Sequence, residues 1–287
     1  MKQFFTVDFE DFCHDTQRRL GIKDPEIKKD SIENSVQEVF KILSKLKGSK
    51  KVTFFCTAQV AISRPDIIKR IAEHGHEIAC HGFYHDNIYD LDPVKFDDSL
   101  HEAKKVLKEI SGKEIIGFRA PRFSIPKENW AMEIIAKHFS YDSSLMSTDH
   151  RIKNYNPNKP LIFKENKIYE YPLYSKKIFN INFNFRFIGG TYIKILPEFL
   201  IHHFVKKSIS ENYIPMLYVH PYEIVKGENF WSNYEKLKEL GFIKSSIWQL
   251  RQLQWLSLNN YFVDKLISIS AKYENLGPIG NFKNNFN

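Results

Sequence analysis

Short apolar blocks and helix-spaced apolar blocks alternate along this 287-residue chain. Residues 3–9 form an apolar run that ends in acids, which is typical of a buried strand. Between such runs lie segments with apolar residues every three or four positions, the spacing of amphipathic helices. Similar short apolar runs predict further strands at 51–56, 76–80, 115–119, 168–172 and 215–220.

Capping residues mark where the helices between these strands should begin and end. Ser31 is expected to cap a helix that runs to about Lys47, with Gly48 as its terminating glycine. The other helices should start at Pro65, after Asp92 and after Pro126, with one more near residues 197–207. Gly75 and Gly112 are expected to close the helices that begin at Pro65 and Asp92.

Strand and helix alternate at least five times, which predicts an α/β fold with a parallel sheet and outer helices. Such a sheet is either doubly wound or closed as a barrel. Candidate polar residues come from five segments of the chain, a distribution that favours the (β/α) barrel, whose active sites lie at the carboxyl ends of the strands. We expect one catalytic domain over residues 1–287, in which 226–287 form a helical extension packed on the rest. Residues 149–165 are expected to form a polar rim loop, and residues 281–287 a frayed tail.

Composition narrows the function classes. Hydrophobic residues make up 43% of the chain and charged residues 26%, as in soluble globular proteins. The net charge is +8, but Lys and Arg are scattered among acids and no nucleic-acid-binding signature is present, so no nucleic-acid partner is expected. Three cysteines without CxxC spacing, no signal peptide and no apolar run of about 18 residues predict a cytoplasmic, soluble protein.

A cluster of carboxylates and a pair of histidines suggest a metal site. His81 and His85 are four residues apart, a spacing that would place both imidazoles on one face of a helical turn. Asp8, Glu10 and Asp11 follow the first strand and can supply a third ligand and a base. The alternatives are ordinary surface histidines and a solvated strand end.

Three later segments add candidate groups for catalysis. Arg119 follows a strand and precedes the stiff Pro121, so it can hold a carboxylate. Asp142 can pair with a histidine, and His220 at the end of an apolar strand can act as a general acid. A surface arginine, a simple turn and a core histidine are the respective alternatives. Phosphate-loop, dinucleotide, serine-hydrolase and zincin motifs are all absent from the sequence.

The order of these motifs resembles the polysaccharide deacetylase superfamily, the NodB-homology proteins similar to carbohydrate esterase family 4. The most similar subgroup is the one associated with exopolysaccharide and O-antigen loci. The resemblance covers about residues 3–225 and rests on three segments: Asp8-Phe-Glu-Asp11, Arg119-Ala-Pro-Arg-Phe-Ser124 and His220-Pro-Tyr-Glu223.

The resemblance implies a distorted (β/α) barrel of the NodB type and a role for each matched residue. Asp8 corresponds to the catalytic base, and His81 and His85 to the metal-binding histidines. Phe9 stands where many members have a second Asp, so Glu10 or Asp11 must complete the metal site. Glu10 is preferred because it shares a strand face with Asp8. The resemblance also implies that Arg119 orients the base, that His220 is the general acid and that Asp142 is the partner of His220. The residues implied around the sugar are Pro121, Arg122, Tyr192 and Tyr222, with Gly189–Gly190.

The function implied is a metal-dependent hydrolase that removes an N-acyl group, in the first instance N-acetyl, from an amino sugar. The metal expected is a divalent ion, Zn²⁺ with Co²⁺ or Ni²⁺ as alternatives. The expected partner is an amino-sugar-containing glycan, a nucleotide-sugar or a lipid-linked precursor. A deformylase, a cyclic-amide hydrolase and a non-catalytic sugar-binding relative remain as alternatives. The sequence leaves the oligomeric state open.

Overall fold

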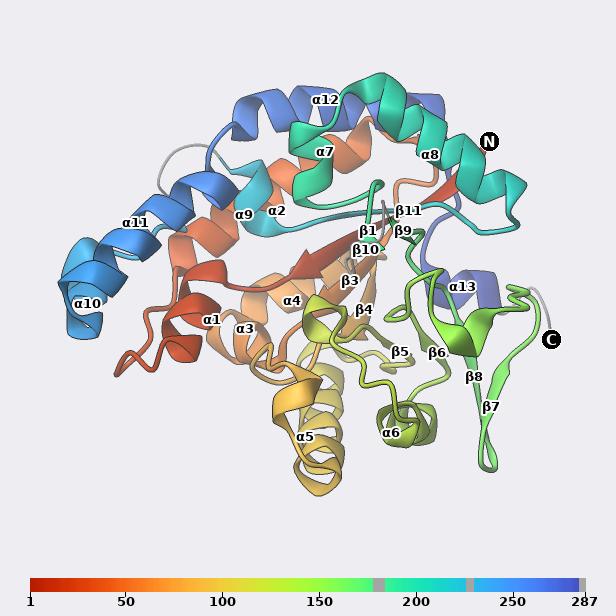
Figure 1. Ribbon diagram of the computed structural model, residues 1–287, viewed down its shortest axis with the longest axis horizontal. Coiled ribbons are helices and arrows are strands. Elements are labelled where there is room, and N and C mark those ends of the chain that lie inside the picture. The colour runs from red at the N-terminus through yellow and green to blue at the C-terminus, as the bar shows by residue number, and fades with distance from the viewer. Residues whose placement is uncertain (178–183, 226–229, 284–287) are drawn as a thin grey trace.

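The computed structural model describes residues 1–177, 184–225 and 230–283, and its main sheet is mostly parallel (Figure 1). The first strand, β1, has parallel partners on both sides, which places its carboxyl end at the centre of the molecule. Seven parallel strands form a distorted barrel, and the predicted fold class is confirmed. In spatial order they are β11 (Met216–Val219), β1 (Lys2–Phe9), β3 (Thr53–Cys56), β4 (Glu77–Cys80), β5 (Gly117–Phe118), β6 (Tyr141–Asp142) and β8 (Asn166–Glu170).

Helices cover the outside of these strands, as the apolar spacing predicts. The helix after Asp92 shows why: the Asp92 side chain accepts a hydrogen bond from the Lys95 N–H, Pro93 occupies the first turn, and Gly112 ends the helix with φ of 65°. Its apolar stripe packs on the core. The helices up to β11 are α1 (Phe12–Arg19), α2 (Lys29–Ser44), α3 (Ala58–Ser63), α4 (Pro65–Glu73), α5 (Pro93–Ser111), α6 (Trp130–His138), α7 (Thr191–Ile195) and α8 (Glu198–Ser210).

Two expectations about local structure are wrong. Helix α2 begins at Lys29, so Ser31 is not its cap, and it ends at Ser44 rather than Lys47. Gly48 instead lies in the short strand β2 (Lys47–Gly48) with φ of 80°. The segment from His81 to His85 is not helical: it is a loop after β4 in which His85 has φ of 62°. A loop can bring two side chains together as well as a helical turn can, but the spacing alone does not predict it.

The polar loop 149–165 is also more ordered than expected. It contains a 3₁₀ turn (His150–Ile152), and its last part forms β7 (Leu161–Phe163), which pairs antiparallel with β8. Further 3₁₀ turns cover Ile88–Asp90, Pro121–Phe123 and Lys238–Leu240. A small separate ladder joins β9 (Lys176–Lys177) and β10 (Asn184–Phe185).

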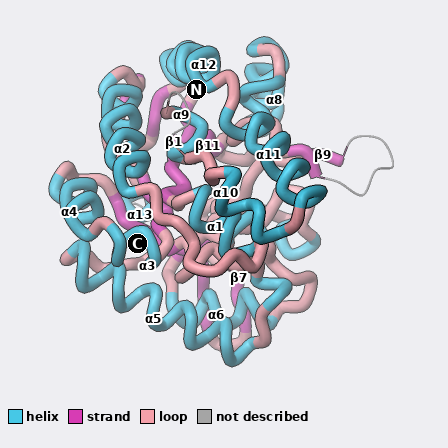
Figure 2. Tube along the Cα trace, turned by 90° about the vertical axis from the view of Figure 1, so that its left-hand side faces the viewer, coloured by secondary structure: helices cyan, strands magenta, loops and turns pink. Residues whose placement is uncertain are grey.

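The chain after β11 begins with the short helix α9 (Pro221–Ile224) and continues as α10 (Tyr234–Leu237), α11 (Phe242–Leu256) and α12 (Asn259–Lys272). It is not purely helical, because β12 (Glu274–Asn275) pairs with β1 and β2 before α13 (Ile279–Lys283). In Figure 2, α10 and α11 lie on the face turned toward the viewer, near α1. Across the three described ranges, no helix combines the length and apolar character that a membrane crossing requires.

Candidate active site

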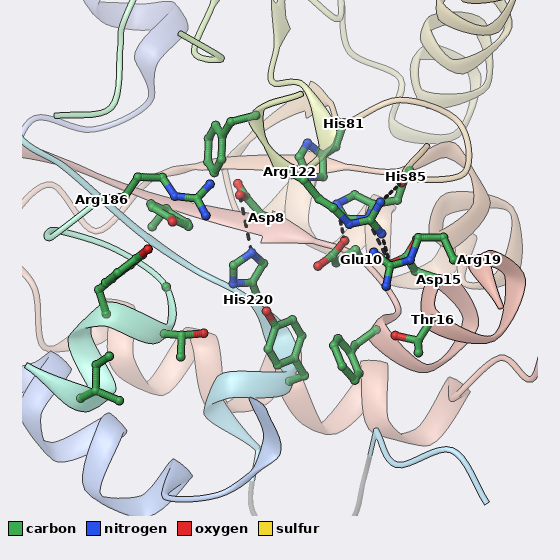
Figure 3. Close-up of a pocket in the computed structure, with 18 of the residues that line it drawn as sticks. Asp8, Glu10, Asp15, Thr16, Arg19, His81, His85, Arg122, Arg186 and His220 are labelled. Carbon is green, nitrogen blue, oxygen red and sulfur yellow. Dashed lines mark hydrogen bonds and ion pairs between the residues drawn. The ribbon is translucent and has the colours of Figure 1, made fainter. Parts of the chain in front are cut away.

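A cavity of about 430 Å³ opens at the carboxyl ends of the central strands (Figure 3). Asp8 and Glu10 enter it from β1, and His81 and His85 enter from the loop after β4. His220, directly after β11, faces Asp8 from the other side. These residues are separated by more than two hundred positions, and the parallel sheet places them together because its strands end at one edge.

Glu10, His81 and His85 form a buried cluster in which one ligand atom from each lies within 4.8 Å of the others. Two imidazole nitrogens and one carboxylate oxygen are a donor set that Zn²⁺ and related divalent ions accept. The orientation of His81 fits this use, because its Nδ1 lies 2.8 Å from the backbone carbonyl of Arg119. Since a carbonyl only accepts, Nδ1 carries the proton and Nε2 keeps its lone pair for a metal. Burial lowers the pKa of His81 to about 4, which keeps the ring neutral.

His85 is held by a carboxylate that the sequence interpretation missed. Asp15 on α1 places Oδ2 3.3 Å from His85 Nδ1, and Asp15 also forms an ion pair with Arg122. A carboxylate on the outer nitrogen is the usual support for a metal-binding histidine. On the inner side, His85 Nε2 lies 2.6 Å from Oε2 of the buried Glu10. A buried carboxylate that faces two imidazoles fits a cation held by all three groups.

Asp11 lies apart from this cluster. It is the N-cap of α1: Oδ1 accepts hydrogen bonds from the backbone of Cys13 and His14, at 2.9 and 3.1 Å, and Oδ2 accepts one from Lys28 at 2.6 Å. These three bonds occupy both oxygens. The structure therefore brings Glu10, and not Asp11, together with His81 and His85.

Asp8 is fixed by Arg119, which is fully buried inside the barrel. The guanidinium Nη1 lies 2.5 Å from Asp8 Oδ1 and also donates to the Thr6 hydroxyl. Burial would raise the pKa of Asp8, but Arg119, His81 and His220 outweigh it and hold that pKa below its ordinary value. Arg119 thus orients two groups at once: its side chain holds Asp8 and its carbonyl holds His81.

His220 has a different partner from the one expected. Its Nδ1 lies 2.9 Å from Oε2 of the fully buried Glu223, and its Nε2 lies 3.9 Å from Asp8 Oδ2. Burial would lower the pKa of His220, but Glu223 reverses this and raises it. The expectation that Asp142 is the partner is wrong, because the Asp142 oxygens bond to Ser144 and Asp142 lies against Glu170. The His-Pro-Tyr-Glu segment contained the signal, since Glu223 is three residues after His220 in a helical turn.

Of the residues expected around the sugar, Arg122, Gly190, Tyr192 and Tyr222 line the cavity. Gly189 does not line it, and Pro121 is buried beside Gly82. The Tyr222 ring stacks on His220, with centroids 4.9 Å apart. Arg122 donates hydrogen bonds to the Asn87 side chain and to the His85 carbonyl, so it braces the loop after β4 that carries His85. Cavity-lining residues that the sequence interpretation did not assign are Phe12, Asp15, Thr16, Arg19, Phe123, Arg186, Thr191, Ile195, Tyr218 and Trp248.

Comparisons with known proteins agree with this class of fold. The chain resembles the crystal structure of a candidate polysaccharide deacetylase from Mycobacterium smegmatis, with a TM-score of 0.51 over 96% of this chain and 94% of that one. The identity is 18%, so the likeness concerns the fold.

Sequence comparison finds two family models and several relatives that match parts of the chain. Residues 28–136 match the model "Polysaccharide deacetylase", and residues 143–261 match "Domain of unknown function (DUF3473)". A peptidoglycan deacetylase-like protein of Gibberella zeae is 32% identical over 126 residues, 44% of this chain and 37% of that protein. Peptidoglycan deacetylase of Helicobacter pylori is 34% identical over 83 residues, 29% of this chain and 28% of that protein. The matches thus span about a third of the length of these relatives, and two successive parts of the chain resemble the polysaccharide deacetylase and DUF3473 models.

Proposed function

We propose that this protein hydrolyses the N-acyl group, in the first instance N-acetyl, of an amino sugar in a polysaccharide or its precursor. Glu10, His81 and His85 would hold a divalent ion, Zn²⁺ being the one that the donor set suits best. Such an ion, when bound, lowers the pKa of water toward neutrality and polarises the acyl carbonyl. The observation that carries the proposal is the placement of Asp8, buried and paired with Arg119, at the same cavity as the buried Glu10–His81–His85 cluster.

Asp8 is suited to accept a proton from the attacking water. Its low pKa keeps it ionised at neutral pH, and the Arg119 guanidinium holds Oδ1, which leaves Oδ2 toward the cavity and His220. A positioned carboxylate of this kind contributes about 10²–10⁴-fold to the rate.

His220 is suited to donate a proton to the departing nitrogen. Glu223 outweighs burial and raises the pKa of His220, which favours the protonated imidazole, and it fixes Nδ1, so that Nε2 is the nitrogen turned toward Asp8 and the cavity. An amide nitrogen leaves only as an amine, so an acid on the face opposite the base is what the reaction requires. The aromatic rings of Tyr192 and Tyr222 at the cavity offer flat surfaces against which a sugar ring can pack.

The test combines a turnover assay with metal analysis. The purified chain is incubated with N-acetylated and N-formylated amino sugars, and released acetate and formate are measured separately. Asp8→Asn is expected to lower turnover by about 10³-fold or more while its metal content stays that of the parent protein. His81→Ala is expected to lose the metal together with activity.

Two results would count against the proposal. The base assignment is wrong if Asp8→Asn turns over at the parental rate. The metal assignment is wrong if the protein hydrolyses equally fast after strong chelation. Formate release without acetate release would leave the active-site assignment intact and identify the acyl group as formyl rather than acetyl.

A further inference from the structure

Helix α11 differs from an ordinary surface helix: the polar Ser245 and Gln252 are buried beside Leu256, whereas five apolar side chains are exposed. The buried Ser245 donates hydrogen bonds to the carbonyls of Leu237 and Gly241. Gln252 is 1% exposed, and its Oε1 accepts the Ser232 N–H at 2.6 Å. These hydrogen bonds fix which side of α11 faces the protein.

The outward side of α11 carries five apolar residues that are between 47% and 79% exposed: Phe242, Ile243, Ile247, Leu250 and Leu253. A helix that packed on a core would bury such residues and expose its serines and glutamines. A contiguous exposed apolar surface of this kind marks an interaction site.

The apolar surface continues onto the neighbouring helices and reaches the mouth of the active-site cavity. Leu258 and Tyr261 at the start of α12 are 64% and 59% exposed, and Ile195 at the end of α7 is 66% exposed. Lys194 donates hydrogen bonds to Ser257 and Asn259, which places Ile195 beside the α11–α12 junction. We call these eight residues the α11 face: Ile195, Phe242, Ile243, Ile247, Leu250, Leu253, Leu258 and Tyr261.

The α11 face and the cavity share Ile195 of α7. Trp248, which lies on α11 but is not part of the α11 face, also lines the cavity. Whatever covers the α11 face is therefore adjacent to the substrate entrance.

The charge of helix α11 has one sign. It carries Lys244 and Arg251, both exposed, and no Asp or Glu, whereas Asp264 on α12 is exposed three residues after Tyr261. The whole chain carries +8. A helix with an exposed apolar side, aromatic residues and only basic charges matches the chemistry of the interface of an anionic bilayer, where apolar residues enter between headgroups and Lys and Arg contact lipid phosphates.

We propose that the α11 face docks the protein on a membrane surface that bears anionic lipids, with the active-site cavity opening at that surface. A second copy of the chain is less favoured as the occupant. Two α11 helices in contact would bring together Lys244 and Arg251 of both copies, and α11 itself carries no acid to offset these four positive charges. The docking goes beyond the proposed function and does not depend on hydrolysis. Its consequence for the substrate, an amino sugar presented at the bilayer surface on a lipid carrier, does rest on the proposed function.

The test measures binding without turnover. The full chain is sedimented with vesicles of phosphatidylcholine alone and of phosphatidylcholine mixed with phosphatidylglycerol, at low and at physiological salt. The double variant Ile247→Glu/Leu250→Glu removes apolar contact and adds negative charge on the α11 face. The matched control is Val94→Glu/Ile162→Glu, which changes two residues that are 70% and 66% exposed on α5 and β7. Thermal unfolding and size-exclusion chromatography with light scattering report folding and oligomeric state.

We expect the parent protein to bind the phosphatidylglycerol vesicles at least about tenfold more strongly than phosphatidylcholine vesicles, and less strongly as salt rises. The α11 double variant should lose at least about tenfold in binding while the control binds like the parent. The proposal is overturned if the folded parent protein does not bind vesicles that contain phosphatidylglycerol. It is also overturned if the α11 double variant binds these vesicles as strongly as the parent does. A parent dimer that becomes monomeric in the α11 variant, without vesicle binding, would identify a second copy as the occupant instead. Because no outcome uses turnover, failure of the docking and failure of the deacylation proposal are distinguishable.

Discussion

The two walls of the active-site cavity are built differently. The wall from the first half of the chain consists of charged groups, each held by a buried partner: Asp8 by Arg119, and His85 by Asp15 and Glu10. The wall from the second half is mainly aromatic and comes from loops and short helices, with Tyr192 and Tyr222 at the cavity. Among the described residues on that side, His220 and its partner Glu223 bring buried charge, and the half-buried Arg186 also lines the cavity.

The contrast follows from what each wall must do. Groups that move protons or hold a metal need fixed geometry, and in this barrel that geometry is supplied by strand ends and by Arg119 in the interior. Groups that recognise a sugar ring need area and shape, which aromatic side chains on loops provide. The family matches divide in a similar way: the deacetylase model ends at residue 136, and the DUF3473 model covers 143–261, the part of the chain that forms the aromatic wall. We therefore expect changes to the charged wall to abolish chemistry and changes to the aromatic wall to alter affinity.

The largest effect is expected at Glu10, and a comparison with its neighbour Asp11 makes the test specific. Glu10→Ala removes the carboxylate that faces both histidines, so metal content and turnover should fall together, the latter by about 10³-fold or more. Asp11→Ala removes a helix cap instead and should cost about 0.5–2 kcal/mol of unfolding free energy with the metal retained. Metal analysis and urea unfolding of both variants separate the two roles. Metal loss in Asp11→Ala with retention in Glu10→Ala would reverse the assignment.

The second prediction concerns the acid on the opposite wall. Because Glu223 raises the pKa of His220, Glu223→Gln should lower that pKa. Activity needs protonated His220 and declines as pH rises through its pKa, so the falling limb of the pH–rate profile should move to lower pH. Turnover at neutral pH should drop about 10–100-fold. The measurement is kcat across pH 5–9.

Asp142→Asn is the matched control for Glu223→Gln, because the sequence favours Asp142 as the partner of His220 and the structure does not. We expect its pH–rate profile to coincide with that of the parent. A shift in Asp142→Asn without one in Glu223→Gln would restore the partner inferred from the sequence.

The Asp142 error shows how far a sequence can predict this site. Strand-end positions predict that Asp8, His81, Arg119 and His220 meet at one site, because a parallel sheet aligns its carboxyl ends whatever the loops do. Asp8, His81 and His220 line the cavity, and Arg119 is buried behind Asp8. Which carboxylate contacts which histidine depends on loop conformation, and spacing does not encode that. His85 at φ of 62° and Asp15 across from it illustrate the point. The fold class followed from periodicity, whereas β12 in the sheet did not, because a two-residue strand leaves no pattern.

The third prediction compares two glycines that each lie against a tyrosine ring. A Cβ on Gly189 would fall 2.0 Å from the Tyr218 ring at the cavity, and a Cβ on Gly117 would fall 2.0 Å from the Tyr141 ring inside the barrel. Gly189→Ala must displace a cavity-lining ring, so we expect KM to rise about tenfold with a smaller change in kcat. Gly117→Ala must displace a core ring, and overpacking should cost about 1–3 kcal/mol of stability. Equal KM effects in the two variants would contradict the division between the walls.

The smallest effect is expected beneath the charged wall, where Asp142 and Glu170 lie together, both fully buried. Burial and then the Asp142 charge raise the pKa of Glu170 well above its ordinary value of 4.5. Since the folded state holds this proton more tightly than the unfolded chain, the stability it contributes is fully present below about pH 4.5 and is lost as pH rises toward the folded-state pKa. Glutamine does not titrate, so the free energy of unfolding of Glu170→Gln should fall less between pH 5 and pH 8 than that of the parent. The two losses should differ by at least about 1 kcal/mol.

Urea unfolding at several pH values measures this difference, with Glu128→Gln on the exposed surface as control. Because the pair lies outside the cavity lining, turnover should be unchanged; a loss of turnover in a stable Glu170→Gln protein would mean that the charged wall extends one layer deeper than Arg119.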